Sequence, residues 1–213
     1  MLKKIIIKLG TGILSSGKGA VRTDRMEQLA ESIARLSKEG IQTIIVSSGA
    51  VGLGMGKLGL EERPKDLALS RACASIGQCR LMNAWSDSLE KAGLIASQVL
   101  VTREDFENKK RSQKVEETLN TLLNRNIIPI VNENDSVSDE EIKFGDNDVL
   151  SALLASIGKA DFLIILSTVK GLMTHPTSGS LIPYVAEITP SIDAMAKGTH
   201  SPTAAGGRVT KID

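Results

Sequence analysis

The fold is decided by the stretch Lys3-Lys4-Ile5-Ile6-Ile7-Lys8-Leu9-Gly10-Thr11-Gly12, close to the start of the chain. Its β-branched run predicts a strand over residues 3–9, because such side chains favour a pleated, half-buried surface. Apolar residues then recur at helical spacing over residues 26–36, and we expect Thr23 to cap that helix. A second β-branched run follows at residues 41–47, so the chain begins as a strand–helix–strand unit.

The same alternation continues along the rest of the chain. Further strands are expected at residues 94–101, 127–131, 161–167 and 181–185, with helices near 65–91, 111–124 and 147–157 and a Gly-rich loop over 48–59. The apolar run at 161–167 has the composition of a buried strand. Strands of this kind, alternating with helices, are typical of an α/β fold with a mostly parallel sheet covered on both faces. Ligands bind to such sheets beyond the carboxyl ends of the strands.

The composition argues against several classes of partner. The 213 residues include 26 Lys and Arg against 25 Asp and Glu, and a net charge of +1 gives no electrostatic footprint for nucleic acid or an anionic membrane. Aromatic residues make up 2%, too few for a base-stacking surface. No apolar stretch approaches the roughly 20 residues of a membrane helix. Two cysteines, Cys73 and Cys79, form no disulfide framework, which favours a reducing, cytoplasmic location.

The first two strands end in residues that suit anions. Lys8 lies near the end of the first strand and is followed by Gly10, Thr11 and Gly12, so backbone N–H groups and a positive charge could meet a phosphate there. The second strand ends in Ser47-Ser48-Gly49-Ala50, whose hydroxyls could bind a carboxylate or a phosphate. A plain turn beside an exposed lysine would have the same sequence.

Two clusters of amides and carboxylates follow the strand at residues 127–131. They are Asn132-Glu133-Asn134-Asp135 and Gly145-Asp146-Asn147-Asp148. Helix capping explains one acid in the second cluster but not both clusters. Such groups can hold an ammonium group, or organise a nearby lysine or Mg²⁺. A last cluster, Gly206-Gly207-Arg208-Val209-Thr210-Lys211, offers either another anion site or a glycine-rich linker.

Other motifs carry less weight. Gly54-Met55-Gly56-Lys57-Leu58-Gly59 matches GxGxxG, but it lies too far beyond its strand, and lacks the later acid, of a dinucleotide-binding fingerprint. His175 and His200 are expected on the surface. No Ser/His/Asp set or HExxH motif is present, which argues against hydrolase and metalloprotease functions.

In their order and spacing, four pieces of the chain resemble the amino acid kinase family: Ile7-Lys8-Leu9-Gly10-Thr11, Ser47-Ser48-Gly49-Ala50, Val131-Asn132-Glu133-Asn134-Asp135 and Gly145-Asp146-Asn147-Asp148. The resemblance covers essentially the whole chain. It implies a three-layer α/β/α sandwich with a mostly parallel central sheet, and a kinase that uses ATP and Mg²⁺. It further implies phosphorylation of the side-chain carboxylate of L-glutamate to glutamyl 5-phosphate, the first step of proline biosynthesis.

The resemblance also implies roles for individual residues. Lys8 and Lys211 should touch the transferred phosphate, and Asp146 should orient these lysines. Glutamate is expected on Ser48, Gly49, Asn134, Asp135, Asn147 and Asp148. ATP is expected along Lys8, Gly10, Thr11, Ser167, Thr168, Lys170, Gly206, Gly207 and Lys211. No metal ligand is assigned. Feedback inhibition by proline and a homo-oligomer are implied in the same way.

Three features differ from the family pattern. Thr168 stands where the family usually has Asp, and Ala204-Ala205-Gly206-Gly207-Arg208 stands for the usual Gly-Thr-Gly-Gly-Met. The chain also stops at Asp213, where family kinase domains continue. We therefore expect residues 1–213 to form an amino acid kinase domain shortened at its C-terminus, without the small RNA-binding-type domain that many members add.

Three alternative functions are open at this point. A kinase of the same family could act on aspartate, N-acetylglutamate or carbamate, although the clusters at 132–135 and 145–148 favour glutamate. A non-catalytic module that senses glutamate or proline would bind its ligand without releasing ADP. A NAD-dependent dehydrogenase, suggested only by GxGxxG, would bind NAD and no ATP.

Overall fold

The computed structural model of the chain describes residues 2–15, 19–137, 147–175 and 179–197. Its strands are β1 (Lys4–Leu9), β2 (Gln42–Ser47), β3 (Ile95–Val101), β4 (Ile127–Glu133) and β5 (Phe162–Leu166). Its helices are α1 (Thr11–Leu14), α2 (Thr23–Lys38), α3 (Ala50–Leu58), α4 (Leu67–Lys91), α5 (Glu104–Glu107), α6 (Lys109–Leu123), α7 (Asn147–Ile157) and α8 (Pro190–Lys197). The five strands predicted before residue 168 are thus confirmed.

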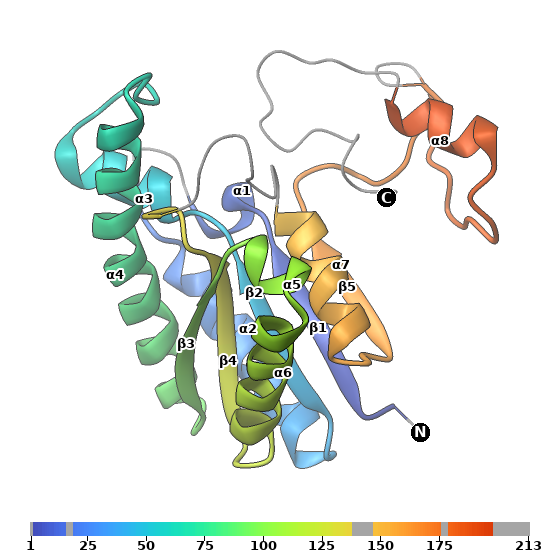
Figure 1. Cartoon of the computed structure of the whole chain (residues 1–213), viewed down its shortest axis with the longest axis horizontal. Coiled ribbons are helices and arrows are strands. Elements are labelled where there is room, and N and C mark those ends of the chain that lie inside the picture. The colour runs from blue at the N-terminus through green and yellow to red at the C-terminus, as the bar shows by residue number, and fades with distance from the viewer. Residues whose placement is uncertain (1, 16–18, 138–146, 176–178, 198–213) are drawn as a thin grey trace.

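The strands form one all-parallel sheet in the order β3-β4-β2-β1-β5. β1 is an inner strand, and its Lys8 lies opposite Val46 of β2 and Ile165 of β5. Because all strands run the same way, their carboxyl ends lie along one edge of the sheet, at the top of Figure 1. The predicted parallel α/β architecture is confirmed.

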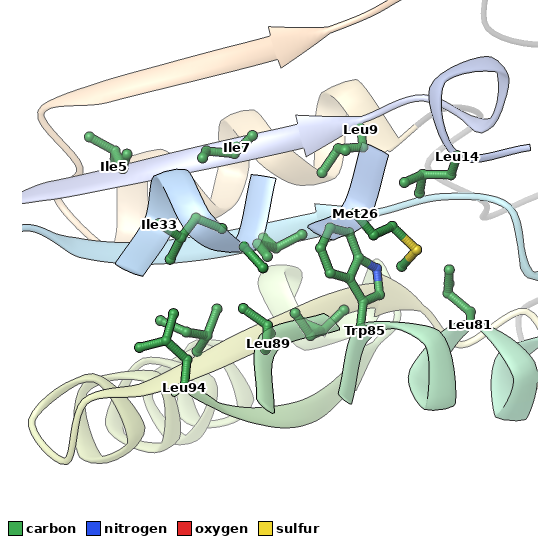
Figure 2. Close-up of a cluster of buried hydrophobic side chains, with 14 of the residues drawn as sticks. Ile5, Ile7, Leu9, Leu14, Met26, Ile33, Leu81, Trp85, Leu89 and Leu94 are labelled. Carbon is green, nitrogen blue, oxygen red and sulfur yellow. The ribbon is translucent and has the colours of Figure 1, made fainter. Parts of the chain in front are cut away.

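Helices cover both faces of the sheet, which gives three layers (Figure 1). Successive side chains of a strand point to opposite faces, so Ile7 and Ile6 belong to different hydrophobic clusters. The cluster of Ile7 packs against α2 and α4, with Trp85 fully buried in it (Figure 2). The cluster of Ile6 packs against α6 and α7 through Leu119 and Leu150.

The Gly-rich loop predicted over residues 48–59 is wrong, because most of it is helix α3. This helix crosses α4 at very close range. A Cβ atom on Gly54 would lie 1.8 Å from the Cys73 carbonyl oxygen, and one on Gly77 would lie 1.7 Å from the Ala50 carbonyl oxygen. Glycines are therefore required where the two backbones meet, despite their poor helix propensity. Within the GxGxxG motif, Gly54 is a packing residue and Gly59 ends the helix with a φ of 68°.

The helix ends follow the sequence signals only in part. Thr23 does not cap α2 but is its first helical residue, and Arg22 occupies the cap position without a side-chain hydrogen bond that caps the helix. Asp66 and Asn108 cap α4 and α6, each accepting two backbone N–H groups. Gly40 follows α2 with a φ of 77°, a left-handed conformation in which helices commonly end.

The predicted burial of the strand at 161–167 is also wrong. Phe162 and Ile164 of β5 are 61% and 42% exposed, and among the described residues β5 pairs only with β1. An apolar run indicates a strand but does not show whether both of its faces are covered. The short strand predicted at 181–185 is absent from this described segment, where Leu181 forms an isolated bridge with Met173.

Asp161 ties the start of β5 to the start of β1. Its carboxylate accepts hydrogen bonds from the backbone N–H groups of Lys3 at 2.8 Å and Lys4 at 2.9 Å. These bonds favour the ionised form, so they lower the pKa of Asp161 below its ordinary value. The carboxylate therefore helps to set the register of an edge strand.

Candidate active site

A cavity of about 270 Å³ lies at the carboxyl edge of the sheet. The predicted site residues that line it are Thr11, Ser48, Gly49, Asp135 and Asn147. They come from the segments that follow β1, β2 and β4 and from the start of α7, so the parallel topology brings together four separate parts of the sequence. The size of the cavity suits a molecule as small as an amino acid rather than a large ligand.

Lys8 and Asp148 form a buried ion pair beside this cavity. Lys8 comes from β1 and is 3% exposed, while Asp148 comes from the first turn of α7 and is 2% exposed. A charge that is withdrawn from water needs a partner, and each side chain supplies one for the other. Lys8 is thus held in a fixed position, and Asp148, predicted to hold substrate, directly contacts the lysine.

A chain of amide side chains runs from α4 to the cavity. Asn132 of β4 donates to Gln78 Oε1 of α4 at 2.8 Å, and its own Oδ1 accepts from Asn147 Nδ2 at 2.8 Å. Asn147 Nδ2 also donates to Ser48 Oγ at 2.9 Å. The indole N–H of Trp85 donates to the neighbouring Ser47 Oγ at 3.0 Å. These bonds fix the end of β2 against α4 and α7.

The loop after β1 lies between the loops that follow β2 and β5. Gly10 N–H donates to the Leu166 carbonyl oxygen at 3.1 Å. A Cβ atom on Gly12 would lie 2.8 Å from Thr168 Cγ2, and one on Gly49 would lie 3.9 Å from Thr11 Cγ2. The phosphate loop predicted at Gly10 and Thr11 therefore adjoins both the cavity and the predicted nucleotide segment.

The predicted nucleotide residues beyond β5 lie on the opposite side of the β1 loop from the cavity. Thr168 and Lys170 are exposed, and Ser167 Oγ accepts from the Val169 N–H at 3.4 Å. Their side chains are placed where a bound molecule could reach them, along the edge formed by Gly10 and Gly12.

Several predicted residues lie outside the described part of the chain: Asp146, Gly206, Gly207, Lys211 and His200. Asn134 is described but is not among the residues that line the cavity, and its backbone N–H donates to the Val101 carbonyl oxygen at 2.8 Å. His175 is exposed, as predicted.

The cavity lining also includes residues that were not among the predicted site residues, Asn132 and Met55 among them. Arg63, between α3 and α4, brings a cation to the lining, and Glu133 brings an acid that is only 9% exposed. The first turn of α3 lines it with Ala50, Val51 and Gly52. Glu133 belongs to a cluster already singled out, whereas neither Arg63 nor the helix start has a distinctive signal in the sequence.

Two further features of the described residues concern membranes and metal ions. None of the described helices is long and apolar enough to cross a membrane. In the described ranges, no three His, Cys, Asp or Glu side chains gather into a group that could hold a metal ion. Described acids at this edge of the sheet include Asp148, which pairs with Lys8, and the cavity acids Glu133 and Asp135.

The sheet is all-parallel, and a loop suited to binding anions and a polar cavity lie at its carboxyl edge. Together these features define a protein that binds small charged ligands there. The chain belongs to the amino acid kinase family, whose match covers residues 3–213.

Relatives within the family are substantially similar. A glutamate 5-kinase of Clostridium acetobutylicum is 44% identical over 99% of this chain and 80% of its own length. A glutamate 5-kinase of Syntrophotalea carbinolica is 42% identical, and glutamate 5-kinase 2 of Bacillus subtilis is 43% identical, each over 100% of this chain. The chain spans 58% of the length of each of these last two relatives.

Proposed function

We propose that this chain is a kinase that transfers the γ-phosphoryl group of ATP to the side-chain carboxylate of L-glutamate. The product is glutamyl 5-phosphate, and the reaction is the first step of proline biosynthesis. The observation that carries the proposal is the buried Lys8–Asp148 pair beside a small cavity with acidic, amide and hydroxyl groups. The similarity to relatives named glutamate 5-kinase supports it.

The cavity offers complementary groups for each part of glutamate. Asp135 and Glu133 supply negative charge for the ammonium group. The first backbone N–H groups of α3 and the guanidinium of Arg63 suit a carboxylate, because a helix start and a cation both favour negative charge. A ligand with one ammonium and two carboxylate groups fits this distribution better than a monoacid does.

Lys8 supplies the positive charge at the transfer point. The acceptor carboxylate is already ionised at pH 7, so the reaction needs no general base. An acceptor oxygen forms a bond to the γ-phosphorus while the bond from that phosphorus to the β–γ bridging oxygen breaks, and ADP leaves with those electrons. The protein's task is to hold the two oxygens in line and to offset the charge on the transferred group. Asp148 keeps the Lys8 ammonium in place for this role.

ATP is proposed to lie along the β1–β5 side of the edge, over Gly10, Thr11, Ser167, Thr168 and Lys170. Glycines at this position allow phosphates to approach the backbone closely. The γ-phosphate then lies between this segment and the cavity, above Lys8. Mg²⁺ would arrive with the ATP phosphates and neutralise part of their charge. By the family resemblance, Lys211, Gly206 and Gly207 complete the phosphate contacts and Asp146 orients the lysines.

Other parts of the proposal rest on family resemblance. They are inhibition by proline as the end product, assembly into a homo-oligomer and a cytoplasmic location. Proline carries the ammonium and α-carboxylate groups of glutamate, so the cavity groups that suit these two charges suit proline as well.

Trapping with hydroxylamine tests the proposed reaction, because hydroxylamine converts an acyl phosphate to a hydroxamate as it forms. The protein is incubated with ATP, Mg²⁺ and hydroxylamine, with glutamate, aspartate and N-acetylglutamate in parallel. Hydroxamate with glutamate and not with the other two acids is the expected result. Hydroxamate with another acid would keep the reaction and change the substrate. Its absence with all three, from folded protein that binds glutamate, would support the sensing module.

A further inference from the structure

Arg63 is the one cation among the described residues that line the cavity. Its side chain is exposed and forms no ion pair or hydrogen bond with any residue in the described ranges. The acids Glu133 and Asp135 belong to the same lining. A carboxylate that enters the cavity is therefore repelled by these two acids and attracted by the guanidinium of Arg63.

The chain is held in place on both sides of Arg63, in the short connection between α3 and α4. Leu60 N–H donates to the Met55 carbonyl oxygen at 2.9 Å, which ties this connection to the end of α3. Asp66 caps α4 by accepting two backbone N–H groups, each at 3.2 Å. Pro64 disfavours a helical backbone at the preceding Arg63. Because the connection is already ordered, less flexibility is lost when Arg63 binds an anion.

The place of Arg63 along the sheet edge distinguishes between the two carboxylates of glutamate. The connection between α3 and α4 lies at one end of this edge, and β5 and α7 lie at the other (Figure 1). In the proposed reaction, the γ-carboxylate meets the phosphate on the β1–β5 side, beside Lys8. The α-carbon end of glutamate then extends toward the α3–α4 side, so its α-carboxylate is the anionic group that faces Arg63.

We propose that Arg63 binds the α-carboxylate of the substrate and so selects free amino acids over derivatives whose α-carboxyl group is amidated. This inference rests on the proposed function, because it orients glutamate within the same cavity. The planar guanidinium can donate two parallel N–H groups to a carboxylate. A neutral α-amide offers one oxygen without a negative charge, and its own N–H groups face the donors of Arg63. Peptides in which another residue follows the glutamate are disfavoured in the same way.

The test compares glutamate with glutamate α-amide, in which a neutral amide replaces only the α-carboxylate. Calorimetric titration gives the dissociation constant of each ligand, and hydroxamate formation gives kcat and the KM for ATP. Arg63→Met removes the charge, and Arg63→Lys keeps a charge without the planar guanidinium. Arg125→Met is the matched control, because Arg125 is exposed between α6 and β4, at the opposite edge of the sheet. Circular dichroism checks the folding of each variant.

The unchanged protein should bind glutamate more tightly than its α-amide. Arg63→Met should raise the dissociation constant of glutamate about fivefold, the effect expected of an exposed ion pair that water screens. The dissociation constant of the α-amide and the KM for ATP should stay close to their original values, because neither ligand presents an α-carboxylate. Arg63→Lys should retain part of the preference for glutamate, and Arg125→Met should change none of these constants.

An equal loss of affinity for both ligands in Arg63→Met would show that Arg63 does not bind the α-carboxylate and would overturn the proposal. So would an unchanged dissociation constant for glutamate, or equal affinity of the unchanged protein for the two ligands. If Arg63→Met does not fold, Arg63→Gln is measured in the same way, and failure of both to fold would indicate a structural role instead. If the unchanged protein forms no hydroxamate, the proposed function fails separately. The titrations still test Arg63 in that case, and no binding of glutamate to the unchanged protein would overturn its assignment.

Discussion

Lys8 and Asp148 form an ion pair that is almost completely withdrawn from solvent, with exposed fractions of 3% and 2%. They join β1 to the start of α7 at the edge of the sheet where the cavity lies. Removing one member of a buried pair leaves the other charge without compensation, at a cost of roughly 3–5 kcal/mol. A substitution of Lys8 therefore affects the stability and the chemistry of the protein together.

We expect Lys8→Ala to lower kcat by about 10²–10³-fold, the usual effect of losing one preorganised electrostatic group. The free energy of unfolding should fall as well, by roughly 3–5 kcal/mol, because Asp148 remains buried after its Lys8 partner is removed. Hydroxamate formation measures the first effect, and urea denaturation measures the second. Normal turnover in this variant would show that Lys8 is not part of the active site.

The double variant Lys8→Ala/Asp148→Asn is the control that separates the two effects. It removes both charges, so most of the lost stability should return while kcat stays low. A recovery of kcat together with stability would show that Lys8 acts only by supporting the fold.

Gly12→Ala should weaken ATP binding through one identifiable steric contact. A Cβ atom at this position would lie 2.8 Å from Thr168 Cγ2, closer than such atoms normally approach. The β1 loop and the segment after β5 must then move apart, and the KM for ATP should rise more than the KM for glutamate. Adding Thr168→Ser removes the Cγ2 methyl group and should restore the KM for ATP. A double variant as defective as the single one would disprove this explanation.

Gly77→Ala should destabilise the protein by forcing α3 and α4 apart. The new Cβ would lie 1.7 Å from the Ala50 carbonyl oxygen, and overpacking of this kind typically costs about 1–3 kcal/mol. Since Ala50 lines the cavity, the KM for glutamate should rise too. The control is Gly52→Ala, whose Cβ would meet Thr11 Cγ2 at 3.9 Å and no other described atom within 4 Å outside its own helix and chain neighbours, and which should not lower the melting temperature. Equal melting temperatures for the two variants would contradict the proposed close crossing.

These same glycines explain why the sequence misled us about α3. Glycine has the lowest helix propensity of all residues except proline, and this stretch contains Gly52, Gly54 and Gly56. A loop was therefore the reasonable prediction. Tertiary contact overrides that propensity, because a close approach to α4 admits only glycine at Gly54. The five strands of the sheet were predictable from their β-branched, apolar runs, and parallel topology fixes where their carboxyl ends meet.

The partners of the predicted residues were not predictable. Gln78 and Asn132 bond across the interior, but nothing in the helical spacing of residues 65–91 distinguishes Gln78 from a surface glutamine. Arg63 lies in an irregular segment without periodicity, so its place in the cavity lining depends on the path of the chain between α3 and α4. Sequence patterns locate elements, whereas side-chain pairing depends on packing in three dimensions.

Asp161 should make stability depend on pH in the acidic range. Its pKa is lowered from 3.8 by the backbone N–H groups of Lys3 and Lys4. The ionised carboxylate therefore contributes its full stabilisation above pH 3.8, and this is lost as the pH falls through the lower pKa of the folded state. Asp161→Asn should melt at a lower temperature than the unchanged protein at pH 6, and the difference should shrink below pH 3.8. A difference that is constant from pH 6 to pH 3 would contradict the role of charge.

The position of β1 between β2 and β5 places one short loop in contact with two separate regions. Thr11 faces the segment after β2, and Gly12 faces the segment after β5. A ligand that binds on one side of this loop and orders it also orders the side that a second ligand contacts. Less conformational entropy is then lost when that second ligand binds. Thermodynamic linkage makes this effect mutual. If the proposed function holds, this arrangement predicts substrate synergism, in which glutamate tightens the binding of ATP by the same factor as ATP tightens that of glutamate.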